Sequence, residues 1–201
     1  MKRCVVLMAL AGLLLFAVPQ SALAQAKPGY SFVEVGYNEI DVDGLGSGSG
    51  FSDEGSGGYA AAQFGFLKRF HVFGRYDSNN TDTADADLNR ATLGGGWHGM
   101  LGEKADLTVD VAWVDQEFDP SGSPGFDDSG YFGRVGASWR PIKLFEVGGW
   151  VRYQDVGDFD SGTVVDANAI LNLWRIGIGL AAEVESDIET YSAFARFNFG
   201  G

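Results

Sequence analysis

The chain has 201 residues, of which 30 are glycine, 13% are aromatic and 20% are charged. Its formal net charge is −13, and so acidic a surface argues against nucleic acid as a partner, because Lys and Arg are what bind a phosphate backbone. Many glycines and aromatic residues without a helical period are typical of an all-β protein, and the length suits one domain.

The N-terminus has the three parts of an export signal. Lys2 and Arg3 are basic, residues 5–18 are almost wholly apolar, and Ala22-Leu23-Ala24 offers small residues for cleavage. The apolar run is shorter than the roughly 20 residues that a membrane-spanning helix needs. We therefore predict a cleaved signal peptide over 1–24 and a single domain over 25–201. Cys4 is the chain's one cysteine, so we expect neither disulfide nor thiolate chemistry in the domain.

Apolar and polar residues alternate with period two in ten segments, each about as long as a strand of a membrane barrel. In chain order the segments are 30–41, 57–67, 70–78, 89–98, 105–116, 130–140, 144–155, 163–172, 174–184 and 190–199. An even number of strands returns both ends of the domain to one side. Eight strands remain an alternative if two weak segments merge.

The connections between these segments alternate between short and long. The short ones lie at 68–69, 99–104, 141–143 and 173, and the longer, acidic, Gly- and Ser-rich ones lie at 42–56, 79–88, 117–129, 156–162 and 185–189. Bacterial outer-membrane barrels have short turns in the periplasm and long loops outside. We therefore predict an antiparallel up-and-down transmembrane β-barrel, exported through the periplasm to the bacterial outer membrane.

Aromatic residues stand at both ends of the apolar faces. Beside the short turns lie Phe66, Phe70, Trp97, Trp139, Phe145, Trp174 and Phe199, and at the opposite ends lie Tyr37, Tyr76, Trp113, Tyr131, Tyr153 and Tyr191. Between them the same faces carry small or aliphatic residues such as Ala60, Val111 and Ile178. Amphipathic rings prefer the headgroup level, so two belts around an apolar band predict a membrane barrel. A soluble β-barrel with inward alternation is the alternative, and it does not account for rings at both ends.

The opposite, polar faces carry arginine and carboxylate side chains in equal number. These are Arg75, Arg90, Arg134, Arg152 and Arg196, with Glu34, Asp77, Asp110, Glu146 and Asp166. Unpaired buried charges are costly, so we expect the two sets to pair inside a narrow lumen. The bulky inward residues Phe73, Phe132, Trp150 and Phe194 would occupy further volume. We therefore expect a plugged lumen with little or no diffusive conductance.

Residues suited to catalysis or to metal binding are few. His71 and His98 are the only histidines, and both face the lumen near the short turns, away from substrates that reach the outer leaflet. We predict that they belong to the polar network of the lumen. The sequence has no Gly-x-Ser-x-Gly elbow, phosphate loop or zinc spacing. We therefore predict no catalytic, cofactor-binding or metal-binding residue.

The acidic loops lack the twelve-residue spacing of an EF-hand. We interpret them as solvated segments that keep a surface protein soluble. The alternative is that they share the divalent cations that bridge lipopolysaccharide phosphates.

The last segment ends in Phe197-Asn198-Phe199, after an alternating run that starts at Tyr191. With this strand the chain resembles the small outer-membrane β-barrel proteins of Gram-negative bacteria, with two more strands than OmpX or the OmpA barrel. The resemblance implies that the barrel-assembly machinery reads the terminal aromatic pattern, although Gly200 and Gly201 follow it here. More loosely, segments 30–37 and 70–76 are similar to a barrel family of xanthomonads and relatives once linked to quorum sensing.

These observations predict a non-enzymatic integral outer-membrane protein with a plugged lumen. Its acidic extracellular loops would serve envelope integrity or surface interaction. The expected partners are outer-membrane lipid and lipopolysaccharide, and the barrel-assembly machinery during biogenesis. A small-solute channel and an enzyme acting at the outer leaflet are the alternatives.

Overall fold

A computed structural model describes residues 30–43, 52–81, 86–121, 124–157, 160–185 and 188–199. The predicted signal peptide and mature start lie outside these residues. The strands are β1 Phe32–Asp43, β2 Ser52–Phe66, β3 Phe70–Thr81, β4 Ala86–Met100, β5 Ala105–Pro120, β6 Phe126–Ile142, β7 Phe145–Val156, β8 Asp160–Leu173, β9 Ile176–Glu185 and β10 Ile188–Asn198. In this part of the chain the structure contains no helix long and apolar enough to cross a membrane.

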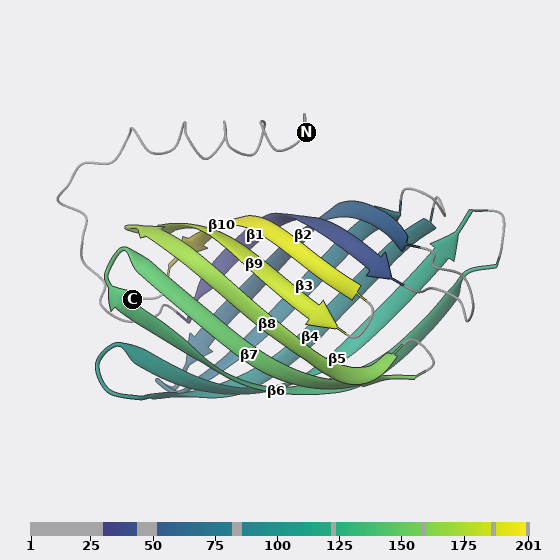
Figure 1. The fold of residues 1–201 in the computed structure, drawn as a ribbon. Coiled ribbons are helices and arrows are strands. Elements are labelled where there is room, and N and C mark those ends of the chain that lie inside the picture. The colour runs from purple at the N-terminus through teal and green to yellow at the C-terminus, as the bar shows by residue number, and fades with distance from the viewer. Residues whose placement is uncertain are drawn as a thin grey trace.

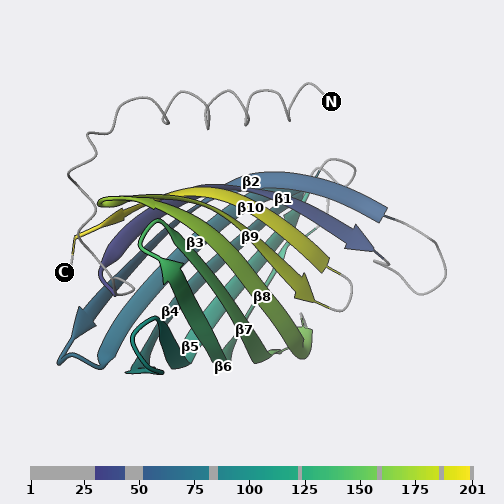
Figure 2. The ribbon, with the colours of Figure 1, turned by 60° about the vertical axis from the view of Figure 1, so that its left-hand side comes forward.

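The ten strands form one closed antiparallel barrel (Figure 1). Each strand pairs with its neighbours in sequence, and β1 closes the barrel against β10 from Phe32 opposite Asn198 to Val42 opposite Ile188. The strands run obliquely around the barrel, and β1 and β10 lie side by side in both ribbon views (Figure 2). The prediction of a ten-stranded up-and-down barrel is therefore confirmed, and the eight-stranded alternative is wrong.

Several strands extend further toward the long loops than the sequence pattern predicts. β2 begins at Ser52 rather than 57, and β6 begins at Phe126 rather than 130. The pairing of β1 with β2 continues through Asp41 opposite Glu54, where neither residue is apolar. Backbone hydrogen bonds alone extend a ladder in water, and they leave no apolar period in the sequence. For this reason the loops predicted before β2 and β6 are longer than those in the structure.

The short turns connect β2 to β3, β4 to β5, β6 to β7 and β8 to β9. The predicted turn at 99–104 is shorter, because β4 continues to Met100. Leu67, Lys68 and Trp174 have φ of 50°, 62° and 63°, a left-handed conformation that hairpin turns require and that Gly or Asn adopts most easily. Trp174 therefore lies in a turn, and not at the start of a strand as the pattern predicted.

Side chains alternate between the lumen and the outside along each strand. On β7, for example, Arg152, Gln154 and Val156 are buried while Val151 and Tyr153 are exposed. The inward apolar residues form two small clusters rather than a continuous core. One cluster contains Ala112, Val114, Phe132 and Val156, and the other contains Tyr59, Ile170 and Phe194. Polar and charged side chains lie between and around these clusters.

Inward aromatic rings pack closely over glycines of neighbouring strands. A Cβ atom at Gly136 of β6 would collide with the Trp150 ring of β7, and one at Gly179 of β9 would collide with the Phe194 ring of β10. Only glycine leaves room for a ring at these two positions. The many glycines therefore let bulky rings lie flat against the inner wall.

Candidate functional site: the charged lumen and the apolar outer face

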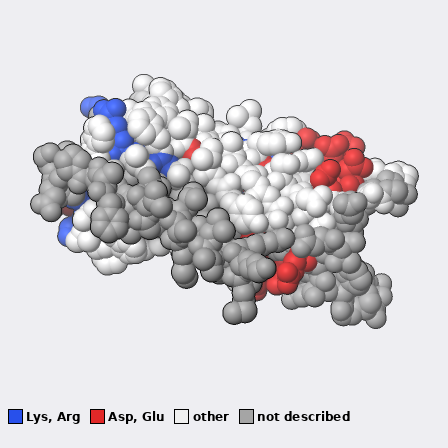
Figure 3. Space-filling view, turned by 90° about the horizontal axis from the view of Figure 1, so that it is seen from above, with Lys and Arg blue, Asp and Glu red and all other residues white. Residues whose placement is uncertain are grey.

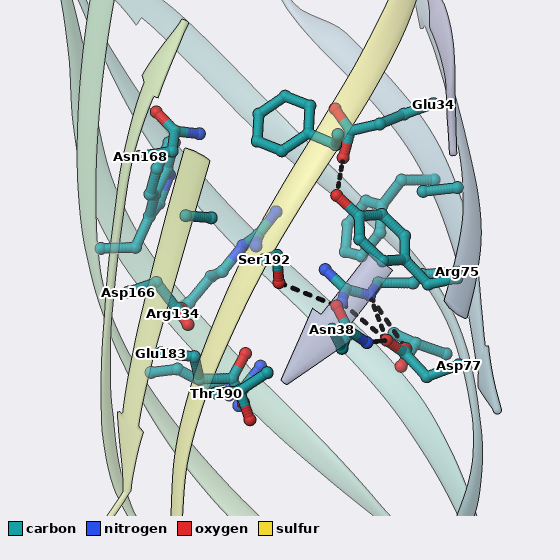
Figure 4. A pocket seen from close by; sticks show the side chains of 18 of the residues that line it. Glu34, Asn38, Arg75, Asp77, Arg134, Asp166, Asn168, Glu183, Thr190 and Ser192 are labelled. Carbon is teal, nitrogen blue, oxygen red and sulfur yellow. Dashed lines mark hydrogen bonds and ion pairs between the residues drawn. The ribbon is translucent and has the colours of Figure 1, made fainter. Parts of the chain in front are cut away.

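Three of the predicted lumen arginines pair with predicted lumen carboxylates. Arg75 Nη2 lies 2.6 Å from Asp77 Oδ1, Arg134 Nε lies 2.6 Å from Asp110 Oδ2, and Arg196 Nε lies 2.7 Å from Glu34 Oε2. Asp110 is almost wholly buried. Figure 4 shows the Arg75–Asp77 pair at the lumen wall, with Asn38 donating from Nδ2 to Asp77 Oδ1 over 3.1 Å. Charge-assisted hydrogen bonds of this length offset the desolvation of both groups.

The other two arginines meet a carboxylate that the sequence pattern did not single out. Arg152 Nη2 lies 2.5 Å from Glu183 Oε1, and Arg90 Nη1 lies 3.6 Å from the same oxygen. Arg90 also donates from Nη2 to Gln154 Oε1 over 3.0 Å. Glu183 has the inward parity of Gly177 and Gly179 on β9, and this parity was the signal that could have identified it.

Glu146 and Asp166 are placed differently from the rest of the predicted set. Glu146 pairs with Arg140, a second residue that the pattern missed because it stands at the end of its segment. Asp166 lies opposite Glu183 across the β8–β9 ladder and lines the lumen beside Asn168 (Figure 4). It belongs to none of the salt bridges found in the described ranges.

Aromatic rings lie against several of these charges inside the barrel. The guanidinium carbons of Arg75 and Arg196 each lie 3.9 Å from a ring centre, that of Tyr59 and that of Phe32 respectively. Tyr59 also donates its hydroxyl to Glu34 Oε1 over 2.8 Å. Stacked guanidinium groups are held in place and partly desolvated. Fixed polar groups thus line this part of the lumen wall.

A cluster around the two histidines occupies the short-turn end of the lumen. His71 Nε2 lies 2.9 Å from Asp110 Oδ1, and the Nδ1 atoms of His71 and His98 are 3.5 Å apart. The Tyr30 ring stacks on His98 with centroids 3.5 Å apart. Within the described residues no three His, Cys, Asp or Glu side chains are grouped so as to hold a metal ion. That these histidines serve the lumen network rather than catalysis stays a prediction.

A cavity of about 270 Å³ lies among these groups. Its lining extends from Tyr30 and Ser138 near the short turns to Asn79, Glu185 and Ile188 near the loops. The cavity is therefore elongated along the barrel and lined by both signs of charge.

The outer face is apolar over most of the strand length. Val111, Leu93 and Leu180 expose 67%, 66% and 66% of their surface. Among the residues predicted for the two belts, Trp97 is half-buried, while those that are exposed are Phe66, Phe70, Trp139, Phe145, Trp174, Phe199, Tyr37, Tyr76, Trp113, Tyr131, Tyr153 and Tyr191. So large an exposed apolar surface, completely encircling the molecule, is foreign to a soluble monomer.

Comparisons with known proteins give matches in fold only. No protein-family model matches the sequence, and no curated protein matches it. Among solved structures, the chain is similar to the translocator domain of the autotransporter NalP from Neisseria meningitidis, with 9% identity, a TM-score of 0.51 and 98% of each chain covered.

Two further solved structures are similar at lower TM-scores. OprG, an outer membrane protein from Pseudomonas aeruginosa, has 14% identity and a TM-score of 0.46, over 88% of this chain and 98% of that one. Ail, the attachment invasion locus protein of Yersinia pestis, has 14% identity and a TM-score of 0.42, over 85% of this chain and 100% of that one.

The match to the translocator domain, together with the closed ten-strand topology, shows the fold. The narrower resemblance to the xanthomonad family stays a prediction. The chain has the transmembrane type of antiparallel β-barrel fold that the sequence predicted.

Proposed function

We propose that the chain is a non-enzymatic integral protein of the bacterial outer membrane, with a lumen closed to free diffusion and with acidic extracellular loops. The protein acts in envelope integrity or in surface interaction through those loops. Its lipid partners are outer-membrane lipid and lipopolysaccharide, and the barrel-assembly machinery inserts it.

The observation that carries this proposal is the apolar band on the outer face. Val35 on β1, Val111 on β5 and Leu180 on β9 expose 60%, 67% and 66% of their surface from three different strands. In water this apolar band would drive aggregation. In a bilayer its side chains contact lipid tails, which are equally apolar. Every strand pairs on both sides, so no backbone edge is left to face hydrocarbon.

Closure of the lumen is supported by the paired charges and the inward rings. A solute would have to break bonds such as Arg152–Glu183 or move rings such as Phe132 and Trp150 to pass. Each charged pair separated in a narrow, poorly hydrated lumen is expensive. The barrier therefore lies in the wall itself and needs no separate plug domain.

Surface interaction is supported by the charge at the loop end. Glu39, Glu54, Asp119, Asp127 and Glu189 are exposed there, and this end has no exposed Lys or Arg among the residues described. Carboxylates are ligands for hard divalent cations, so a partner reaches this end through such cations or through its own basic groups.

Planar-bilayer recording of the refolded, purified chain tests the proposal. We expect insertion into lipid bilayers, with current no larger than brief, small openings. Large stable openings would contradict the closed lumen, and failure to insert would contradict the membrane assignment.

A small-solute channel is the second candidate, and the elongated cavity favours it. Its lining connects the two ends of the barrel, from Ser138 to Ile188. Liposome swelling separates the candidates: a channel admits small sugars or amino acids, whereas the closed barrel leaves swelling at the rate of protein-free liposomes.

A further inference from the structure

The exposed charges of the barrel are separated by sign. Every exposed Lys or Arg that the structure describes lies in a short turn, and these five are Lys68, Arg69, Lys104, Lys143 and Arg175. Among the residues of these turns, Glu103 is the one exposed acid. Figure 3 shows Lys and Arg gathered at the left-hand end and Asp and Glu at the right-hand end of the molecule. We call the five residues the basic ring.

The ring is spread around the whole rim rather than concentrated in one pocket. Lys68 and Arg69 come from the β2–β3 turn, and the other three come one each from the β4–β5, β6–β7 and β8–β9 turns. In a closed barrel of this strand order, these turns succeed one another around the circumference. A compact anionic ligand would engage one arc of such a ring. An annulus of lipid engages all of it.

Along the barrel axis, the basic ring lies where the exposed apolar surface ends. Lys68 directly follows Leu67, and Arg175 directly follows Trp174, with 78% and 60% of those apolar side chains exposed. The Arg175 guanidinium carbon lies 5.3 Å from the Trp174 ring centre. Long basic side chains beside interfacial rings place their charge at the headgroup level of a bilayer.

The turn backbone adds an independent sign of interfacial placement. Leu67 and Trp174 have positive φ, where bulky residues cost of order 1 kcal/mol more than glycine. In water, a large apolar side chain in such an exposed turn gains no burial that would offset this cost. At a lipid interface it gains burial.

The charges of Lys68, Arg69, Lys104 and Arg175 are not paired with a carboxylate in the part of the chain that the structure describes. Lys104 donates from Nζ to the Pro141 carbonyl near the end of β6 over 3.0 Å, a contact that leaves its charge without a carboxylate partner. Within the described ranges, Lys68, Arg69 and Arg175 belong to none of the salt bridges.

We propose that the basic ring binds the phosphate groups of anionic glycerophospholipids in the leaflet at the short-turn side. This inference rests on the proposed membrane function and adds the lipid class and the leaflet. The acidic loop end does not attract such lipids, so the barrel has an electrostatic orientation as well as a topological one. Polybasic surfaces attract anionic lipid with an energy that grows with each Lys or Arg near the membrane surface.

The test measures lipid selectivity of the full barrel by electron spin resonance. The chain is refolded into phosphatidylcholine vesicles, and spin-labelled phosphatidylglycerol is compared with spin-labelled phosphatidylcholine for the motionally restricted lipid shell. We expect the anionic lipid to be preferred by about two- to fourfold at low salt and the preference to shrink in 0.5 M salt. Equal restriction of both lipids by the native barrel would overturn the proposal.

A matched pair of variants assigns the preference to the ring. One variant neutralises the ring through the substitutions Lys68→Gln, Arg69→Gln, Lys104→Gln, Lys143→Gln and Arg175→Gln. The control neutralises exposed loop-end acids through Glu39→Gln, Glu54→Gln, Glu117→Gln, Asp119→Asn and Asp127→Asn. We expect the ring variant to lose the preference and the control to keep it. A ring variant that keeps the preference would overturn the assignment.

Two further arms separate the remaining explanations. Inorganic phosphate, added at constant ionic strength, leaves the selectivity unchanged if the ring binds lipid, whereas competition at millimolar phosphate would show a free-phosphate site and overturn the lipid assignment. Insertion into pure phosphatidylcholine is measured first by heat-dependent gel migration. Insertion without selectivity rejects the ring proposal alone, while no insertion rejects the membrane function beneath it.

Discussion

At the scale of single residues, the buried Asp110 contacts two side chains of the lumen. Its two oxygens lie 2.9 Å from His71 Nε2 and 2.6 Å from Arg134 Nε. The Arg134 guanidinium also lies over three rings, those of Phe73, Phe132 and Trp150. One carboxylate therefore links the histidine cluster with the aromatic wall.

Replacing Asp110 with Asn should destabilise the barrel by about 1–3 kcal/mol, because it leaves Arg134 without its charge partner while water in the lumen screens part of the loss. Urea unfolding in lipid vesicles measures this. The exposed Glu39→Gln serves as the control and should change stability by less than about 0.5 kcal/mol. If the two variants unfold alike, Asp110 does not hold Arg134 in the folded protein.

The close packing of inward aromatic rings on glycines should make the stability of the barrel sensitive to an added methyl group. In Gly136→Ala the new methyl group meets the Trp150 ring, and overpacking of this kind costs about 1–3 kcal/mol. Gly133→Ala is the matched control on the same strand, because its Cβ would face outward with no atom nearer than 4.0 Å. A lower urea midpoint is expected for the Gly136 variant alone. Equal midpoints would show that Trp150 does not lie over β6.

At the scale of the strand, each β-strand divides its length between the membrane and water. The outward face of β5 carries Val109, Val111 and Trp113 and then, at the loop end, Glu117 and Asp119, all of them exposed. The apolar stretch ends at the aromatic side chain of Trp113, and the exposed acids lie beyond it, toward the loop. The strand thus marks the limits of the hydrocarbon layer along its own sequence.

An arginine placed on this face should therefore have a cost that depends on depth. Val111→Arg is expected to lose about 2–4 kcal/mol of stability in a bilayer, and Glu117→Arg, six positions along the same face, no more than about 1 kcal/mol. Reversible unfolding in vesicles measures both. Similar costs at the two positions would show that the face of β5 does not cross hydrocarbon.

Strand pairing was predictable from the sequence only in part. The period-two pattern identified all ten strands, because a membrane imposes alternation on each of them. It failed at strand ends such as Ser52, which pairs with Asp43 where the strand has no apolar alternation. Charge partners were harder still, because Arg152 on β7 and Glu183 on β9 meet across an intervening strand.

The functional residues missed by the pattern share one cause. Glu183 stands two residues before β9 ends at Glu185 and close to a predicted acidic loop, and Arg140 stands at the end of its segment. A charged residue near a strand end has no sequence mark that separates a lumen position from a loop position. Its partner on another strand decides, within one hairpin for Arg140 and Glu146 and across an intervening strand for Glu183 and Arg152.

The seam at which β1 pairs with β10 closes the barrel, and its register can be tested by cross-linking. Val35 lies opposite Ala195, so cysteines introduced at both positions should form a disulfide under mild oxidation. Val35→Cys with Tyr191→Cys, four positions out of register, is the control and should stay reduced. Gel migration with and without reductant distinguishes the two. A cross-link formed only in the control would show that β1 and β10 pair in a different register.

At the scale of the whole molecule, the barrel is asymmetric along its axis. One end has short turns and exposed basic residues such as Lys104, and the other has exposed acids such as Asp127 and Glu189. Between them lies the apolar band, and inside lies a lumen of paired charges. This division into two unlike ends and an apolar middle is what orients a protein across a membrane.

This asymmetry predicts one orientation across the outer membrane, which labelling of single cysteines on intact cells measures. Asp127→Cys and Glu189→Cys should react with a membrane-impermeant maleimide from outside, while Glu103→Cys and Lys68→Cys should react only after the membrane is permeabilised. Val111→Cys should stay unlabelled in both conditions. Labelling of Glu103→Cys on intact cells would contradict this orientation, and labelling of Val111→Cys in the folded protein would contradict the membrane-spanning face.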